Sequence, residues 1–268
     1  MISIICPCFN SGDTIDGVIN SLLTQVNTKF KYEVIFIDDG SKDNTISLIK
    51  NGIKQLDSKG ITSKIHLGTH KGPGAARNQG INISNYDYIA FIDSDDIWYE
   101  NKLSICEDLI SKNPKHNLFV HDENYIRKNH NNRVIINGNF EESLPSSLYN
   151  RNCLSTSAVI VKKDLINKYG GFNEKLMSSQ DYELWLRLAP YLIPFKINEV
   201  LGEYRESVNS ITAKFYLYRI LDQLKIAYKY KNYVSYSQFF YKIIKIILSK
   251  QWLYGIKNIV LRSKSHNY

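Results

Sequence analysis

Residues 86–103 read YDYIAFIDSDDIWYENKL, a short apolar run that ends in a cluster of acids. The apolar run, residues 89–92, is typical of a buried β-strand. Asp93, Asp95 and Asp96 follow at the point where such a strand leaves the core. Because burying unpaired carboxylates is costly, their charge must be balanced from elsewhere. Clustered carboxylate oxygens suit Mg²⁺ or Mn²⁺, so the stretch predicts a metal site at a strand end.

The segments around this stretch alternate between strand and helix patterns throughout residues 1–112. Strands are predicted at residues 2–9, 32–38, 63–68 and 87–92, and helices at residues 13–26, 41–56, 72–84 and 100–112. Strand–helix alternation with short connections indicates a mostly parallel sheet flanked by helices. The predicted fold class is therefore α/β and Rossmann-like.

Residues 113–268 follow a looser pattern. We expect a hairpin from residues 117–126 and 132–138, a strand at 155–163, helices at 164–172 and 178–189, a strand at 193–201, a polar loop at 202–212, and helices beyond.

The positive net charge of +8 is concentrated in the C-terminal tail. Residues 213–268 hold eleven Lys and Arg against one acid, Asp222. Two interpretations of this basic amphipathic region stay open. It packs as a helical cap on the rest of the chain, or it docks on anionic lipid as an interfacial region. Nucleic acid binding is not expected, because no groove-directed motif or stacking platform is visible.

Several features favour a cytoplasmic protein. No run approaches the roughly 20 apolar residues of a membrane-spanning helix, and the start, MISIICPCFN, lacks the basic segment of a signal peptide. The four cysteines show no zinc-binding spacing and fit a reducing compartment.

Polar loops follow all four predicted strands of the first half: PCFN at residues 7–10, DDGS at 38–41, GTHKGPGAARN at 68–78 and DSDD at 93–96. Ligands of open parallel sheets bind beyond the carboxyl ends of the strands. A metal held by one or two carboxylates takes further ligands from substrate phosphates. Together the loops predict a site for a nucleotide diphosphate.

Two of these loops also match common turn motifs. Residues 38–41 fit a tight turn with a helix N-cap. Gly72, Gly74 and Gly80 suggest a dinucleotide-binding turn, but they follow the third strand and have the wrong spacing. Lys71 and Arg77 at a helix start still suit phosphate contact.

Five motifs in order resemble the inverting glycosyltransferases of family 2, which have the GT-A fold: PCFN, VIFIDDGSKDNT, GPGAARNQG, YIAFIDSDDIW and SSQDYELWLRLA. The resemblance covers roughly residues 1–212. It implies a nucleotide-binding half at 1–112 and an acceptor-binding half at 113–212, followed by the basic helical region at 213–268.

The resemblance also implies roles for the donor site. Phe9, after Pro7, matches the aromatic residue that stacks on the nucleotide base. Asp39 matches the residue that hydrogen-bonds the base. Arg77 and Lys71 match basic positions near the diphosphate.

The resemblance assigns the acidic residues two roles, metal binding and general-base catalysis. Asp93 corresponds to a ribose or metal contact, Asp95 to the direct ligand of Mn²⁺ or Mg²⁺, and Asp96 to an acid often found beside it. Asp181 corresponds to the general base that takes the proton of the acceptor hydroxyl. Taken alone, Asp181 also fits an acid in the first turn of a helix.

Further contacts with donor or acceptor are expected from six residues: Lys71, Asp96, Trp98, Gln180, Glu183 and Arg205. Glu183 equally fits an ion pair with Arg187 four residues later. Arg205 equally fits a solvated loop arginine.

These observations predict a metal-dependent inverting glycosyltransferase. Its donor is a nucleotide-diphosphate sugar, with UDP favoured, and its acceptor is a hydroxyl of a surface glycan of capsule, O-antigen or lipooligosaccharide type. Two alternatives stay open: sugar transfer to a polyprenyl phosphate, or a non-catalytic, membrane-docking partner of a glycan assembly enzyme. In either case the chain could work on the inner face of the cell membrane.

Overall fold

A computed structural model describes residues 1–127, 132–140, 143–206 and 216–249. The first half alternates as predicted. Its elements are β1 (Ile2–Cys8), α1 (Ile15–Leu23), β2 (Tyr32–Asp38), α2 (Thr45–Ser58), β3 (Thr62–Leu67), α3 (Pro73–Ile83), β4 (Tyr88–Phe91), β5 (Ile97–Trp98) and α4 (Lys102–Lys112). The short strand β5 was not predicted.

The second half contains the predicted hairpin, strands and helices with three differences. Its elements are β6 (Leu118–Ile126), β7 (Arg133–Ile135), α5 (Leu144–Asn150), β8 (Val159–Lys162), α6 (Lys163–Tyr169), α7 (Gln180–Leu188), β9 (Pro194–Arg205), α9 (Tyr216–Lys229) and α10 (Tyr236–Ile247). Helix α5 was not predicted, β8 starts later than expected, and β9 continues into the expected polar loop. The rest of that loop, and the predicted helix beyond residue 249, lie outside the described residues.

One mixed sheet connects both halves, in the order β3-β2-β1-β4-β8-β6-β9-β5, with β7 paired to β6. Strands β3, β2, β1 and β4 are parallel, and so is the long pair β6–β9. Strand β8 runs antiparallel to both β4 and β6 and so links the halves. The prediction of an α/β fold with a mostly parallel sheet is confirmed.

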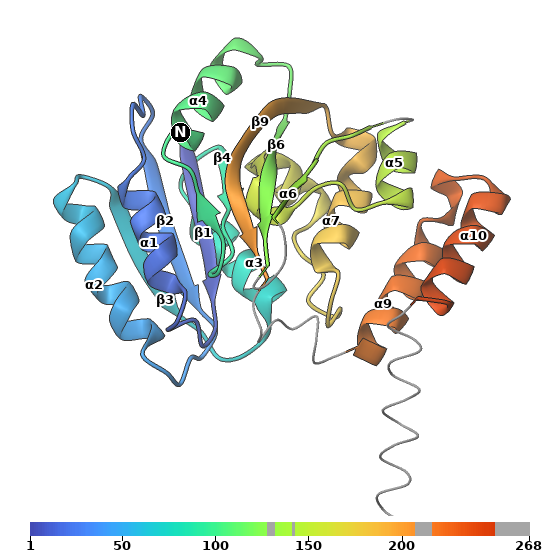
Figure 1. The fold of residues 1–268 in the computed structure, drawn as a ribbon, viewed down its shortest axis with the longest axis horizontal. Coiled ribbons are helices and arrows are strands. Elements are labelled where there is room, and N and C mark those ends of the chain that lie inside the picture. Colours follow the sequence, from blue (N-terminus) through green and yellow to red (C-terminus); the bar gives the residue numbers. More distant parts are fainter. Residues whose placement is uncertain (128–131, 141–142, 207–215, 250–268) are drawn as a thin grey trace, which may run out of the picture.

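Helices cover both faces of the sheet, as Figure 1 shows. Alternate residues of a strand point to opposite faces. On β1, Ile4 therefore packs in one apolar cluster together with Val18 of α1, whereas Ile5 packs in the other. That second cluster also contains Ala76 of α3 and Trp185 of α7.

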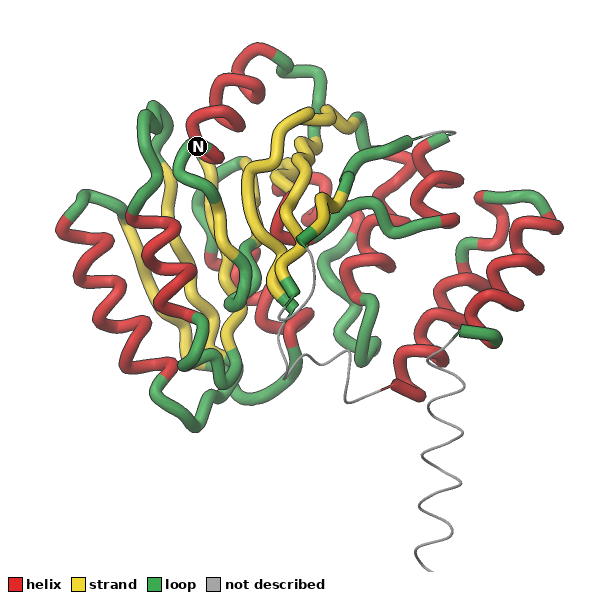
Figure 2. The backbone as a smooth tube through the Cα atoms, viewed as in Figure 1, coloured by secondary structure: helices red, strands yellow, loops and turns green. Residues whose placement is uncertain are grey.

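The two C-terminal helices lie beside each other at the edge of the molecule, next to α5 and α7 (Figure 2). Asp222 of α9 accepts hydrogen bonds from the backbone N–H groups of Met177 and Ser178. Ile226 of α9 and Ile246 of α10 are buried in the core. Both helices therefore pack on the α/β core. Within the described residues, none of the helices combines the length and hydropathy that crossing a membrane requires.

Candidate active site

The four polar loops predicted at strand ends meet at one edge of the sheet. Because β1 to β4 are parallel, their carboxyl ends point the same way (Figure 1). In this sheet Cys8 lies beside Asp38, and Asp38 lies beside Leu67. The loops after β1, β2 and β3 are thus immediate neighbours.

Phe9, Asp39 and His70 form one contact group at this edge. Phe9 is 41% exposed, and its ring stacks on His70 with the ring centroids 4.1 Å apart. Asp39 Oδ2 lies 3.1 Å from His70 Nδ1. The backbone N–H groups of Lys71 and Gly72 donate to Asp39 Oδ1 and Oδ2, each at 2.8 Å. Asp39 therefore fixes the loop between β3 and α3.

Asp38 braces the neighbouring turn, as the turn interpretation of this motif predicts. Its Oδ2 accepts hydrogen bonds from the backbone N–H groups of Gly40 and Ser41. Gly40 has φ +84°, and a Cβ there would lie 3.2 Å from the backbone nitrogen of His70. Glycine thus lets the two loops approach closely.

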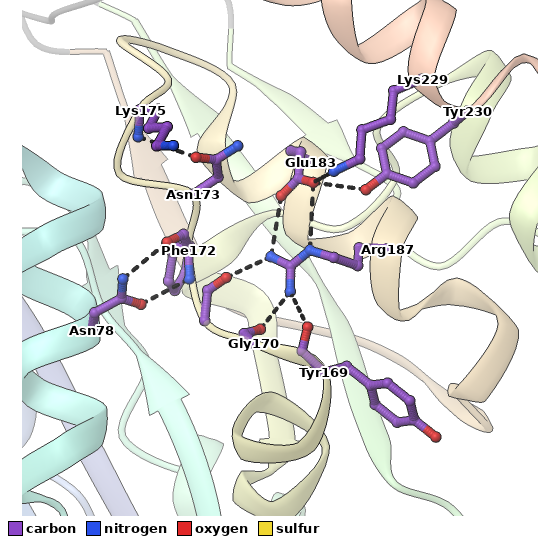
Figure 3. Close-up of polar contacts among 11 residues, drawn as sticks. Asn78, Tyr169, Gly170, Phe172, Asn173, Lys175, Glu183, Arg187, Lys229 and Tyr230 are labelled. Atoms are coloured by element: carbon purple, nitrogen blue, oxygen red, sulfur yellow. Dashed lines mark hydrogen bonds and ion pairs between the residues drawn. The ribbon is translucent and has the colours of Figure 1, made fainter.

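Arg77 is buried and pairs with Asp93. Its Nη2 donates to Asp93 Oδ1 at 2.5 Å, and its guanidinium carbon lies 5.3 Å from the centre of the Phe172 ring. Asn78 exchanges two hydrogen bonds with the backbone of Phe172, which holds that ring in place (Figure 3). The side chain of Lys71, by contrast, is exposed.

Asp96 is a structural acid. It is 2% exposed, and its two oxygens accept from the Ser157 hydroxyl at 2.5 Å and from the backbone N–H of Arg205 at 2.9 Å. Ser157 also accepts a hydrogen bond from the backbone N–H of Asp93. The serine therefore ties β8 to the acid cluster.

Asp95 is the acid of the cluster that lacks such partners. It is half-buried and makes no ion pair within the described parts of the chain. Burial and the neighbouring charge of Asp93 raise the pKa of Asp95 to about 6. A divalent cation would relieve this repulsion. The described residues hold no group of three or more His, Cys, Asp or Glu arranged for a metal.

Asp181 lies in the first turn of α7, after Ser179 in a left-handed conformation with φ +55°. Asn152 Nδ2 donates to Asp181 Oδ2 at 3.0 Å. Burial lowers the pKa of Arg77, but the charges of Asp93 and Asp181 raise it and the net shift is upward. Arg77 thus pairs directly with the acid at the end of β4 and also feels the charge of the acid of α7.

Glu183 does not face the site. It is 1% exposed and accepts from Arg187 at 3.1 Å and from Lys229 and Tyr230 at 2.7 Å (Figure 3). Arg187 also donates to the backbone carbonyls of Tyr169, Gly170 and Gly171. The expected acceptor contact is therefore corrected in favour of the ion pair with Arg187.

Trp98, Gln180 and Arg205 are engaged within the protein. Trp98 is 2% exposed and its indole N–H donates to the Ser157 carbonyl, so the expected ligand contact is corrected to a packing role. Gln180 is buried against Gly74 and donates to the Leu176 carbonyl. The Arg205 guanidinium pairs with Glu203.

Four residues of the site were missed from the sequence: His70, Asn152, Ser157 and Tyr204. Ser157 lies near the start of the predicted strand at 155–163 and Asn152 precedes it, and polar residues there carry no distinctive signal. His70 stood in a predicted phosphate-binding loop, where its ring contact with Phe9 was not foreseeable.

Comparison with known proteins identifies a glycosyltransferase family. The family model described as "Glycosyl transferase family 2" matches residues 3–170. The chain is 32% identical over 221 residues to the Escherichia coli protein named UDP-Glc:alpha-D-GlcNAc-diphosphoundecaprenol beta-1,3-glucosyltransferase WfgD, and the match covers 80% of each chain.

Solved structures share the fold at low sequence identity. Residues 1–349 of Staphylococcus aureus TarS, in complex with UDP-GlcNAc, match with a TM-score of 0.72 and 16% identity, over 93% of this chain and 73% of TarS 1–349. A mannosyltransferase from Pyrobaculum calidifontis, in complex with GDP-Man and Mn²⁺, matches with a TM-score of 0.67 and 12% identity, over 100% of this chain and 75% of that one. The expected GT-A fold is confirmed by these likenesses.

Proposed function

Because the chain belongs to glycosyltransferase family 2 and is a glycosyltransferase, we propose that it moves a sugar from a UDP-sugar donor to a hydroxyl of a glycan acceptor, with inversion. The observation that carries this proposal is the buried Arg77, which pairs with Asp93 and also feels the charge of Asp181. Arg77 thereby connects two parts of the proposed site: the strand end expected to bind the nucleotide diphosphate, and the helix expected to carry the general base.

The donor is proposed to bind along the strand ends. Phe9 offers an exposed ring for stacking on the base, and Asp39 offers carboxylate oxygens for a base N–H. Arg77 lies where it can offset negative charge on the diphosphate. UDP is favoured because WfgD is named for a UDP-Glc donor and the TarS structure contains UDP-GlcNAc.

Asp181 is proposed as the general base. The acceptor oxygen attacks the anomeric carbon from the face opposite the leaving UDP, and the bond from that carbon to the diphosphate oxygen breaks. The hydroxyl proton passes to an Asp181 oxygen. Asn152 holds the other carboxylate oxygen, which leaves the carboxylate in a defined orientation.

The acid cluster fits a divalent metal. Asp95, with Asp93 beside it, would hold Mn²⁺ or Mg²⁺. Both oxygens of Asp96 are instead used in hydrogen bonds from the Ser157 hydroxyl and the Arg205 backbone N–H. Such an ion supplies a positive charge that stabilises the leaving diphosphate. The Mn²⁺ in the mannosyltransferase complex supports this assignment without fixing the metal.

The test is turnover of a panel of UDP-sugars by the purified protein with MnCl₂ and a matched pair of variants. Asp181→Asn should lower kcat by about 10²- to 10⁴-fold without changing UDP affinity, since it removes only the base. Asp164→Asn, an exposed acid of α6, is the control and should be unchanged. No turnover of any donor, or equal activity of Asp181→Asn, would contradict the proposal.

The acceptor class is tested separately. WfgD is named for an acceptor on diphosphoundecaprenol, which supports a glycan on a lipid diphosphate. Transfer to a polyprenyl phosphate alone would favour the first alternative. Lipid or partner binding without any donor affinity would favour a non-catalytic docking protein.

Helix α10 supports peripheral membrane docking as a second proposal. Its exposed side chains include the large apolar groups Tyr236, Phe240, Tyr241 and Ile244, with Lys245 among them. Such a surface can enter the interface of an anionic bilayer. Phe240→Glu should abolish co-sedimentation with anionic vesicles, whereas Val26→Glu, an exposed apolar residue on the loop after α1, should not. Equal binding of both variants would exclude α10 as the docking surface.

A further inference from the structure

Three residues form a row across strands β7, β6 and β9. Tyr125 of β6 is the register partner of Arg133 on β7 and of Tyr204 on β9. Register partners lie directly opposite each other and so share one face of the sheet. The rings of Tyr125 and Tyr204 are nearly parallel, at 13°, with centroids 5.7 Å apart. The Arg133 guanidinium carbon lies 4.8 Å from the centre of the Tyr125 ring.

The sheet face that carries this row leads toward Asp181. Residues two apart on a strand share a face, so Tyr125 lies on the side of Glu123. Asn137 bonds both Glu123 and the backbone N–H of Ser155, which fastens the loop before β8 to this face. Asn152, in the same loop, donates to Asp181.

The Tyr204 end of the row adjoins the acids of the candidate active site. The backbone N–H of the next residue, Arg205, donates to Asp96. Burial raises the pKa of Tyr204, and the charges of Asp96, Asp93, Asp95 and Asp181 raise it further. Tyr204 is still 37% exposed, so its ring is accessible at the edge of the site.

The other end of the row is an arginine with no acidic partner in the described parts of the chain. Neighbouring arginines are paired: Arg127 with Glu206 at 2.6 Å and Arg205 with Glu203 at 2.6 Å. Among the described residues, the side-chain contact of Arg133 is with the face of Tyr125, whose hydroxyl is hydrogen-bonded to Glu206, and the Arg133 side chain is exposed. It can therefore accept an anionic ligand without losing an ion pair.

We propose that Tyr204, Tyr125 and Arg133 form the acceptor subsite, which takes a sugar that carries a phosphate group on its anomeric carbon. The sugar ring lies against the exposed Tyr204 ring, since the C–H face of a pyranose suits the negative face of an aromatic ring. The phosphate lies at Arg133, two ring contacts further from the acids. This subsite rests on the proposed function, because it places the acceptor hydroxyl beside Asp181.

Equilibrium binding of two probes tests the subsite. The first is octyl α-N-acetylglucosaminyl diphosphate, and the second is octyl α-N-acetylglucosaminide, which lacks the phosphates. Titration calorimetry would compare the wild-type protein with Tyr204→Ala, Tyr204→Phe, Arg133→Gln and, as a matched control on α9, Arg219→Gln.

Tyr204→Ala should weaken both probes by about tenfold, the upper size of one aromatic contact, and Tyr204→Phe should keep the wild-type affinity. Arg133→Gln should weaken only the diphosphate probe, by about tenfold or more. Arg219→Gln should change neither.

Several results would overturn the subsite. The subsite is wrong if the wild-type protein binds neither probe, or if Tyr204→Ala leaves both affinities unchanged. It is also wrong if Arg133→Gln weakens the binding of both probes equally, or of neither. UDP-sugar hydrolysis without acceptor separates this failure from that of the proposed function. If one of these binding results occurs while the wild-type protein still hydrolyses UDP-sugar, the enzyme stands and the subsite alone is wrong.

Discussion

His70 stacks on Phe9 at 4.1 Å and contacts Asp39 at 3.1 Å, and so holds both groups proposed to bind the nucleotide base. A base cannot use the same face of Phe9 while the imidazole lies on it. A carboxylate accepts about four hydrogen bonds, and His70 is positioned to use one beside those from Lys71 and Gly72. The histidine and the base therefore compete for one place.

Removal of this competitor should tighten UDP binding. We expect His70→Ala to lower the Kd of UDP by about fivefold, the size of one aromatic contact. The loop should keep its shape, because Asp39 still holds the backbone of residues 71 and 72. Titration calorimetry measures the change, with His66→Ala on β3 as the control. Pyrophosphate, which has no base, should bind both proteins equally. Weaker UDP binding by His70→Ala would mean that the histidine helps to hold the base.

Ser157 should stabilise the fold through the acid cluster. Its hydroxyl donates to the buried Asp96, and its carbonyl accepts from Lys102 and Trp98. Ser157→Ala leaves an Asp96 oxygen without that donor, so the free energy of unfolding should fall by about 1–3 kcal/mol. Urea denaturation measures this loss, and Ser104→Ala on the exposed face of α4 serves as the control. Equal stability of the two variants would contradict the prediction.

The strand ends were predictable from the sequence because their signals are local. The residues of the apolar run before Asp93 lie within a few positions of one another, and so do the turn residues around Asp38, so local patterns alone place both motifs. The parallel order of β1 to β4 then follows from the short helical connections.

The second half of the site depends on contacts between distant segments. Ser157 reaches Asp96 only because β8 runs antiparallel to β4, a pairing that no local pattern specifies. Glu183 shows the same limit: its pair with Arg187 followed from helical spacing, but its burial depends on Lys229 and Tyr230 of α9. Trp98 was expected near a ligand because it closely follows the acid cluster in the sequence, yet it is buried and donates to the Ser157 carbonyl.

Asn152 should act as a positioning residue for Asp181. Asn152→Ala removes the donor that orients the carboxylate, and kcat should fall by about 10- to 100-fold while the Kd of UDP stays unchanged. Initial rates with saturating donor measure kcat, and Asn20→Ala on the exposed face of α1 is the control. A loss of UDP affinity with unchanged kcat would place Asn152 at the donor rather than at the base.

Glu183 should make stability depend on pH. Burial raises the pKa of Glu183, but hydrogen bonds from Arg187, Lys229 and Tyr230 outweigh it and hold the pKa below the usual glutamate value. A group whose pKa is lowered in the folded state stabilises the fold above its unfolded pKa, and this contribution is lost as the pH falls through the folded pKa.

Glu183→Gln should therefore lower the free energy of unfolding by about 3 kcal/mol at pH 7, because it leaves two cations without their carboxylate. The difference from the wild-type protein should shrink once the pH falls below the unfolded glutamate pKa of about 4.3. Urea denaturation across this pH range measures both effects, with the exposed Glu199→Gln as the control. A difference that does not change with pH would mean that Glu183 stabilises the α7–α9 contact by its shape and not by its charge.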